Sequence, residues 1–300
     1  MYKIIFLSVL FIVLSCNTKS SQGIQTDKQE ETIKAVKASD SVKFDFESKI
    51  TEFRKQLSPD FIYKTYSSFL VISNLSETET QKSIDNTIAS AEECFYNDYF
   101  EKKPDEITTI FLFKDDETYR YWAKRLFGDT DLSRFGYYKP SKKTMLMNIN
   151  TGGGTLVHEL THAFVRYDFP DIPSWFNEGL GSLYERCSMN NKIILGHTNW
   201  RLPELQSAIA SGTYTSLDLL VNMSEDDFYG YESSLNYAQA RYLCQYLQQK
   251  NILKKFYKTF RDNFSRDTTG KTFLEEITKM KIDVLDEDYL KWIKSLKYSE

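Results

Sequence analysis

The chain has 300 residues, a formal net charge of −4, and 41% hydrophobic, 15% aromatic and 27% charged residues. This length is enough for one large domain or two small lobes, and the composition is that of a soluble globular protein. A nucleic-acid-binding protein would present a basic face, which this charge does not support, so we expect no nucleic-acid partner. The sequence does not indicate an oligomeric state.

Residues 1–16 are typical of a lipoprotein signal peptide. Lys3 supplies a positive charge, and the apolar run over residues 4–14 is too short to span a membrane but has the length of a signal-peptide core. The run is followed by Ser15 and Cys16, which resembles the bacterial lipobox, in which the Cys becomes lipidated after cleavage. We therefore expect an exported protein, anchored to a membrane of the cell envelope through Cys16. A plain secretory signal with an incidental Cys is the alternative.

Residues 17–43 contain no aromatic residue and predict a disordered tether, because they cannot bury enough apolar area to order themselves. From residue 44 onwards, hydrophobic spacing predicts a mixed α/β lobe that ends at residue 150. Its expected elements are a helix over 46–57, a strand over 62–75, a helix over 78–99, a strand over 106–113, a helix over 117–127, and a hairpin of 136–138 and 144–150.

The rest of the chain, residues 151–300, predicts a helical lobe. The helices are expected over 155–167, 175–187, 237–249, 253–264 and 290–296. The sequence therefore predicts an α+β protein with a cleft where the two lobes join. Three further cysteines, Cys94, Cys187 and Cys244, show no CxxC spacing, which excludes a cysteine-rich zinc site and favours buried small apolar side chains. One disulfide among them is left open.

Two of the three histidines lie in the motif HELTH at residues 158–162. A helix advances about 100° per residue, so His158 and His162 project from the same face and can reach one ion. Glu159 projects beside that ion, where its carboxylate can take a proton from a metal-activated water molecule. The glycines at 152–154 let the helix begin sharply, with Thr155 as the candidate N-cap. The apolar residues around the motif favour a ligand over two exposed histidines.

A catalytic zinc ion needs a third protein ligand and an open position for water. Fifteen residues separate His162 from Glu178, enough for the first helix to end, turn at residues 170–173 and return as an antiparallel helix. A set of His158, His162 and Glu178 offers the nitrogen and oxygen donors that suit catalytic zinc. The expected cofactor is therefore Zn²⁺.

The segments HELTHAF and PSWFNEGLGSLYE resemble the peptidase MA-like zinc metallopeptidases of the gluzincin type, and more distantly the aminopeptidase-N and thermolysin families. The resemblance implies a zincin-like fold and hydrolysis of peptide bonds in a peptide or protein substrate. It also implies that a Tyr after the second segment stabilises the oxyanion. By position this is Tyr237, with Tyr229, Tyr231 and His197 as alternatives.

The sequence departs from these families at two places. No Gly-x-Met-x-Asn segment, which recognises a free substrate amine in aminopeptidase-N relatives, precedes His158, and this argues against an exopeptidase of that kind. Thermolysin-like chains carry an Asp four residues after the ligand Glu, where this chain has Ser182. Asn177 or a distant carboxylate would then have to orient the histidine rings. The strand over 144–150 leads into the metal helix, and we expect its edge to pair with an extended substrate.

The function predicted from these residues is that of a zinc-dependent peptidase of the cell envelope. Two alternatives remain: a binding or regulatory lipoprotein that keeps the fold without turnover, and a metal-dependent amidase of the envelope. The presence of Glu159 beside all three ligands favours the peptidase, because a site without turnover has no chemical need of the base.

Overall fold

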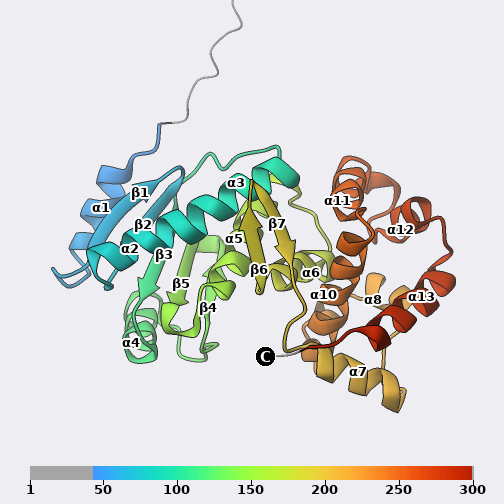
Figure 1. The fold of residues 1–300 in the computed structure, drawn as a ribbon. Helices are drawn as coiled ribbons and strands as arrows, with labels where there is room; N and C mark the ends of the chain where they lie inside the picture. The colour runs from blue at the N-terminus through green and yellow to red at the C-terminus, as the bar shows by residue number, and fades with distance from the viewer. Residues whose placement is uncertain (1–42, 299–300) are drawn as a thin grey trace, which may run out of the picture. The chain divides into compact units, whose positions relative to one another are not determined.

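A five-stranded sheet with helices on both faces makes up the first half of the described chain (Figure 1). The structure, a computed structural model, describes residues 43–298. The sheet has the order β1-β2-β3-β5-β4, and its strands are β1 Ile62–Tyr66, β2 Phe69–Ser73, β3 Thr108–Phe113, β4 Gly136–Lys139 and β5 Thr144–Asn148. The three central strands run parallel, whereas β1 and β4 pair antiparallel at the two edges.

The central strands are buried on both faces, and their side chains alternate between two hydrophobic cores because a strand has a period of two residues. One face packs on α1 (Phe46–Arg54) and α4 (Asp116–Phe127) through Leu70, Ile72, Phe111, Phe113 and Leu146. The other face packs on the core that contains the metal helix, α5 (Gly154–Asp168), which carries the HELTH motif; the strand residues in this core are Phe69, Val71, Ile110, Leu112, Met145 and Met147. The sheet is thus the platform on which the candidate site is built.

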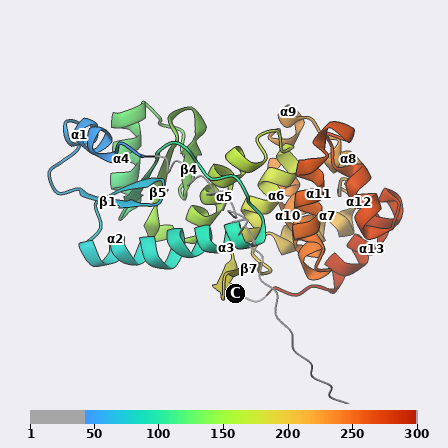
Figure 2. The same ribbon diagram turned by 90° about the horizontal axis from the view of Figure 1, so that it is seen from above.

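The predicted helix over 78–99 is one continuous rod in which α2 (Glu77–Ser83) and α3 (Ser90–Asp98) are joined by a π-helical segment, Ile84–Ala89 (Figure 2). Ser76 caps its start, because its hydroxyl accepts from the Glu79 backbone while the Glu79 carboxylate accepts from the Ser76 backbone. Buried Ile84 and Ile88 belong to the core that contains the metal helix. The rod covers that face of the sheet.

The second half is mainly helical, as expected, so the α+β class is confirmed. Its helices are α5 Gly154–Asp168, α6 Ser174–Tyr184, α7 Leu202–Ser211, α8 Leu217–Val221, α9 Glu225–Phe228, α10 Ser233–Gln249, α11 Leu253–Asp262, α12 Lys271–Thr278 and α13 Ile282–Ser295. Short 3₁₀ turns occur at Pro140–Lys142, Ile149–Thr151 and Phe264–Arg266. Within the compact unit Val42–Glu300, α5 and α6 lie between the sheet and the helices α10–α13 (Figure 1).

Several predicted elements were wrong in detail. The strand expected over 62–75 is a hairpin, because Ser67 adopts a positive φ of 50° and turns the chain. The helix expected to reach Cys187 ends at Tyr184, and β6 (Cys187–Asn190) and β7 (Ile193–Gly196) form a second hairpin whose turn has positive φ at Asn191 and Lys192. The helices α7, α8, α9 and α12 were not predicted, since they are short or weakly periodic.

The expected role of the edge of β5 is also wrong. Its two neighbours, β3 and β4, cover both sides of β5, so β4 and not β5 is the edge strand on this side of the sheet. The hairpin itself was predicted. A strand that leads directly into a helix can still be central when the preceding strand folds back beside it.

The predicted signal peptide, the lipobox Cys16 and nearly all of the tether over 17–43 lie outside the described residues. Within residues 43–298, no helix has both the length and the apolarity needed to cross a membrane. Cys94 and Cys244 are buried and Cys187 is partly buried, and all three are free thiols.

Asp168, the last residue of α5, joins segments that are distant in the sequence. Its buried carboxylate accepts hydrogen bonds from the backbone of Glu101 and Lys102, at 2.7 and 2.9 Å, and from Tyr257 and Arg261, at 2.9 and 2.7 Å. Burial acts to raise the pKa of Asp168, but these hydrogen bonds outweigh it and hold the pKa below its ordinary value of 3.8. The end of α5 is therefore fixed against α11.

We predict that Asp168→Asn lowers the free energy of unfolding by about 3 kcal/mol at neutral pH, because Arg261 loses its buried anion and keeps only exposed ones. Since the folded-state pKa is lowered, the carboxylate stabilises the fold fully above its ordinary pKa, and this contribution is lost as the pH falls through the folded-state value. The difference between wild type and variant should shrink below about pH 4. Chemical denaturation at several pH values measures it.

Asp116→Asn is the matched control. Asp116 pairs with Arg120 on the exposed surface of α4 at 2.8 Å, so its loss should leave the unfolding free energy nearly unchanged. Equal losses in the two variants would contradict the role given to Asp168, and so would a difference that does not change with pH.

Candidate metal centre

The metal helix α5 begins where a turn of glycines brings it against the end of α6. Gly152 has a φ of 100°, and Gly153 precedes the first helical residue without any side-chain cap. A Cβ on Gly154 would overlap the backbone carbonyl of Glu185. Thr155, expected as the N-cap, lies inside the helix instead. The glycines act through close approach rather than through capping.

The following helix, α6, is packed equally closely against α5. A Cβ on Gly181 would lie 3.1 Å from atoms of the His158 ring, and a Cβ on Gly179 would lie 2.8 Å from the Ala240 carbonyl of α10. Two glycines therefore let α6 fit between α5 and α10. This close packing carries Glu178 to the two histidines.

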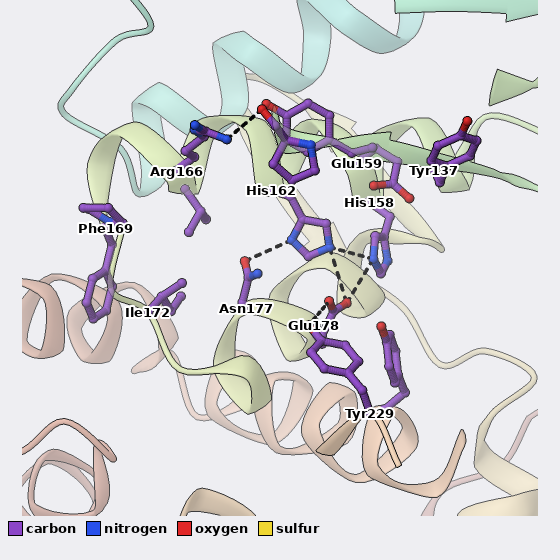
Figure 3. A pocket seen from close by; sticks show the side chains of 15 residues that line it. Tyr137, His158, Glu159, His162, Arg166, Phe169, Ile172, Asn177, Glu178 and Tyr229 are labelled. Carbon is purple, nitrogen blue, oxygen red and sulfur yellow. Dashed lines mark hydrogen bonds and ion pairs between the residues drawn. The ribbon is translucent and has the colours of Figure 1, made fainter. Parts of the chain in front are cut away.

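The structure brings together His158, His162 and Glu178, whose ligand atoms lie within 4.8 Å of one another (Figure 3). The two Nε2 atoms are 2.9 Å apart, and Glu178 Oε2 lies 3.2 Å from that of His158 and 3.3 Å from that of His162. The cluster is a group that could hold a metal ion. Its three residues come from α5 and α6, as the sequence predicted.

The other ring nitrogens of the histidines fix which way the lone pairs point. His162 Nδ1 lies 2.9 Å from Asn177 Oδ1, and His158 Nδ1 lies 3.3 Å from Glu185 Oε1. In a neutral ring His162 Nδ1 donates to Asn177, so its Nε2 lone pair faces the carboxylate of Glu178, whereas His158 Nδ1 lies beside Glu185 without a hydrogen bond among the described residues. Three electron-rich atoms then meet in a buried place, which calls for a cation.

Zinc fits this donor set. Ligand atoms that lie about 2.0–2.1 Å from a tetrahedral zinc are separated by about 3.3 Å, close to the distances between these three atoms. Two imidazoles and one carboxylate leave a fourth position open, which is the pattern of catalytic rather than structural zinc sites. Glu178 Oε2 has no polar partner besides the two rings among residues 43–298.

The protonation of the groups follows from their burial and contacts. Burial acts to lower the pKa of His158, but its contacts with Glu178 and Glu185 outweigh burial and raise the pKa. Burial acts to raise the pKa of Glu178, but the charge of His162 and the hydrogen bonds with both rings hold it well below the ordinary value. Burial raises the pKa of Glu159, against the charges of the two histidines. A raised pKa suits a carboxylate that must accept a proton near neutral pH.

Glu185 was not among the residues predicted from the sequence, although its spacing from Glu178 indicates that it lies near the histidines. It lies seven residues after Glu178, which is two helical turns, and so shares the face of α6 that meets α5. Its carboxylate also pairs with Arg201 at 3.1 Å. Arg201, from the segment after β7, could not be found by helical spacing. Ser182, by contrast, does not reach the rings: its hydroxyl is buried without a partner among the described residues.

The structure separates the four candidates for the oxyanion donor. Tyr229 donates to Glu178 Oε1 at 2.7 Å, so its hydroxyl already orients a ligand. Tyr231 is 99% exposed, and His197 is bound to Ser188 on the second hairpin, and neither lines the cavities at the site. Tyr237 lines both cavities, and burial followed by the negative charge of Glu178 raises its pKa. Of the four candidates, Tyr237 is thus the one that lines both cavities.

Two cavities flank the ligands along α5. One has a volume of about 400 Å³ and extends past His162 to Arg166 and Phe169 at the C-terminal end of the helix. The other, of about 160 Å³, extends from His158 to Thr155, Glu185 and Trp200 at the N-terminal end. They share His158, Glu159 and Tyr237, and strand β4 borders both through Gly136, Tyr137 and Tyr138. A substrate could thus extend to both sides of the ligands.

No protein-family model matches the sequence, and no curated protein does. Among solved structures, the protein is similar to yeast LTA4 hydrolase in complex with bestatin, with a TM-score of 0.41 and 14% sequence identity. The match covers 80% of this chain and 40% of that chain, so the protein spans less than half the length of this neighbour. A TM-score of this size assigns neither a family nor an activity, and the function rests on the site.

We predict that Glu185→Gln lowers the affinity for zinc by about 10- to 100-fold, because the ring of His158 loses the negative charge that lies 3.3 Å from its Nδ1. Competition with a chromogenic chelator measures the dissociation constant. Glu117→Gln, an exposed change on α4 with the same loss of charge, should leave the affinity unchanged. Thermal unfolding of the metal-free proteins separates a lost fold from a lost ligand orientation. An unchanged zinc affinity in folded Glu185→Gln protein would refute the role of Glu185.

Proposed function

We propose that the protein is a zinc-dependent peptidase of the gluzincin type, with a zincin-like fold. The observation that carries this proposal is the convergence of His158, His162 and Glu178 beside the buried carboxylate of Glu159. Two nitrogens and one oxygen with an open fourth position, next to a general base in a cleft, are the parts that hydrolysis of an amide bond requires.

Zinc held by these residues would lower the pKa of a water molecule and polarise the carbonyl group of the peptide bond. Glu159 accepts the proton that the attacking water loses as the new C–O bond forms. It then passes this proton to the leaving nitrogen as the C–N bond breaks. Tyr237 donates a hydrogen bond to the carbonyl oxygen as negative charge develops there.

The residues around the cleft suit an extended peptide. Thr155 and Phe169, at the two ends of the cleft, are fourteen positions apart along α5 and its C-cap, which corresponds to about 21 Å or six residues of extended chain. As the edge strand, β4 can pair with such a chain through its backbone groups. A cleft that continues on both sides of the ligands supports cleavage within a peptide rather than removal of a terminal residue.

The proposed location is the cell envelope, with the protein anchored to a membrane by a lipid on Cys16 and facing away from the cytoplasm. This proposal rests on the sequence of residues 1–16 alone. Recovery of the full-length native protein from the cytoplasm would rule it out. Two or more acyl chains would be enough for stable anchoring.

The proposed function makes a prediction about the metal and the base. Purified protein should contain close to one zinc ion per chain after dialysis, and His158→Ala should lose it. Glu159→Gln should keep zinc while peptide hydrolysis falls by about 10²–10⁴-fold, because an amide cannot accept the proton. Elemental analysis and cleavage of a mixed peptide library, with and without chelator, provide the two measurements.

The outcomes separate the alternatives. Folded protein that does not take up added zinc would contradict the proposed site. Stoichiometric zinc without cleavage of any peptide would favour the binding or regulatory lipoprotein, and hydrolysis of other amides alone would favour the envelope amidase. Full activity of Glu159→Gln would remove that residue from the mechanism.

A further prediction of the proposed function separates the two tyrosines. Tyr237→Phe should lower kcat by about 10²-fold with an unchanged zinc affinity, because only a transition-state hydrogen bond is lost. Tyr229→Phe should weaken zinc binding, because the carboxylate of Glu178 loses a donor at 2.7 Å. Zinc titration and steady-state kinetics of both variants test the assignment. If the two effects are exchanged, Tyr229 is the oxyanion donor.

A further inference from the structure

Arg166 lies in the larger cavity, on the same face of α5 as the two histidine ligands. It follows His162 by four residues, and Figure 3 shows it at the rim of the cavity, away from Tyr137. Four residues of helix correspond to about 6 Å along the axis, or roughly two residues of an extended peptide. A substrate bound in this cavity would therefore pass Arg166 about two residues away from the cleaved bond.

The guanidinium of Arg166 is held in place but is not neutralised. Its Nη1 donates to the backbone carbonyl of Pro140 at 2.9 Å, in the turn between β4 and β5. The ion pairs found within residues 43–298 include none with Arg166. A guanidinium has five N–H donors, so most of them remain available to a ligand.

Arg201, at the opposite end of the cleft, provides the contrast. Its Nη2 and Nε lie 3.1 and 3.3 Å from the carboxylate oxygens of Glu185, so its charge is already paired. Among residues 43–298, the cleft is therefore asymmetric: Arg166 at one end has no ion-pair partner, and Arg201 at the other is paired with Glu185.

The side chains next to Arg166 in the cavity are apolar, and the guanidinium itself is exposed at the rim. Val165, Phe169 and Ile172 line the same cavity and place no anion beside it. The ionised side chains that line the cavity are the carboxylates of Glu159 and Glu178 and the guanidinium of Arg166. With a divalent ion on its ligands the cavity would carry a net positive charge, so an anionic group is favoured there.

We propose that Arg166 makes the protein selective for substrates with a carboxylate about two residues from the cleaved bond. The carboxylate is that of an Asp or Glu side chain, or the free C-terminus of the substrate. A guanidinium recognises either through paired N–H donors. This inference rests on the proposed function, since it assigns the substrate class of the same site.

The test uses peptides that differ only in one carboxylate. In one arm a single Glu is moved through each position around the cleaved bond and compared with Gln. In the other arm each peptide is made with a free C-terminal carboxylate and with a C-terminal amide. The quantity measured is the ratio of kcat/KM between the acidic peptide and its neutral partner, which cancels any general change in activity.

For the wild type we expect a ratio of about 10- to 100-fold in one arm, the range that a hydrogen bond to a charged group contributes. Arg166→Gln should bring the ratio close to one, and Arg166→Glu should reverse the preference towards Lys at that position. Arg166→Lys keeps the charge and should keep part of the preference, even if loss of the contact with Pro140 destabilises the other variants. Arg125→Gln, at an exposed position of α4, removes one positive charge away from the cleft and should keep the full ratio.

A wild-type ratio near one in both arms would overturn the inference, and so would a full ratio in Arg166→Gln.

Failure of the proposed function gives a different result, namely that no peptide is cleaved. If no peptide is cleaved, dissociation constants are measured with Glu159→Gln protein, which needs no turnover. If Glu159→Gln protein binds the acidic peptides more tightly than the neutral ones, and the double variant Glu159→Gln/Arg166→Gln does not, the result would support the carboxylate site without the peptidase. Equal binding of acidic and neutral peptides would overturn it.

Discussion

The close approach of α6 to α5 is the constraint on which the rest of the site depends. Glu178 reaches the histidines only because α6 has glycine at the two positions where it meets its neighbours. Gly181 faces the ring of His158, and Gly179 faces the backbone of α10. At the start of α5, Gly154 makes the same kind of contact with the end of α6. A side chain at any of these positions would push the helices apart, and a metal site tolerates little displacement.

This packing brings electron-rich atoms close together, and that arrangement indicates a metal site. A carboxylate and two imidazole lone pairs are brought within about 3 Å in a buried place, which is unfavourable without a cation. The groups around the three ligands increase the need for a cation. Asn177 accepts a hydrogen bond from the ring of His162, Glu185 places a second carboxylate 3.3 Å from His158 Nδ1, and Tyr229 donates to the carboxylate of Glu178. Bound zinc would therefore contribute to the stability of the folded protein as well as to its chemistry.

The sequence predicted what local spacing can reveal. The four-residue interval between His158 and His162 defined the ligands of α5, and the turn that returns Glu178 to them followed from the residues between the motifs. Most elements of the sheet were found because the buried strands are almost wholly apolar. Glu185 could have been found from its interval of two turns from Glu178. Arg201, the order of β4 and β5, and the second hairpin depend on tertiary packing or on positive φ at non-glycine residues, which no periodicity reveals.

The central claim is that one zinc ion is held by His158, His162 and Glu178, with a fourth position open to water. A crystal structure of the zinc-loaded protein, with diffraction data collected on both sides of the zinc absorption edge, tests it most directly. We expect one anomalous peak about 2.0–2.2 Å from Nε2 of each histidine and from a carboxylate oxygen of Glu178. A peak with other ligands would contradict the account, as would the absence of zinc from these residues in protein saturated with the metal.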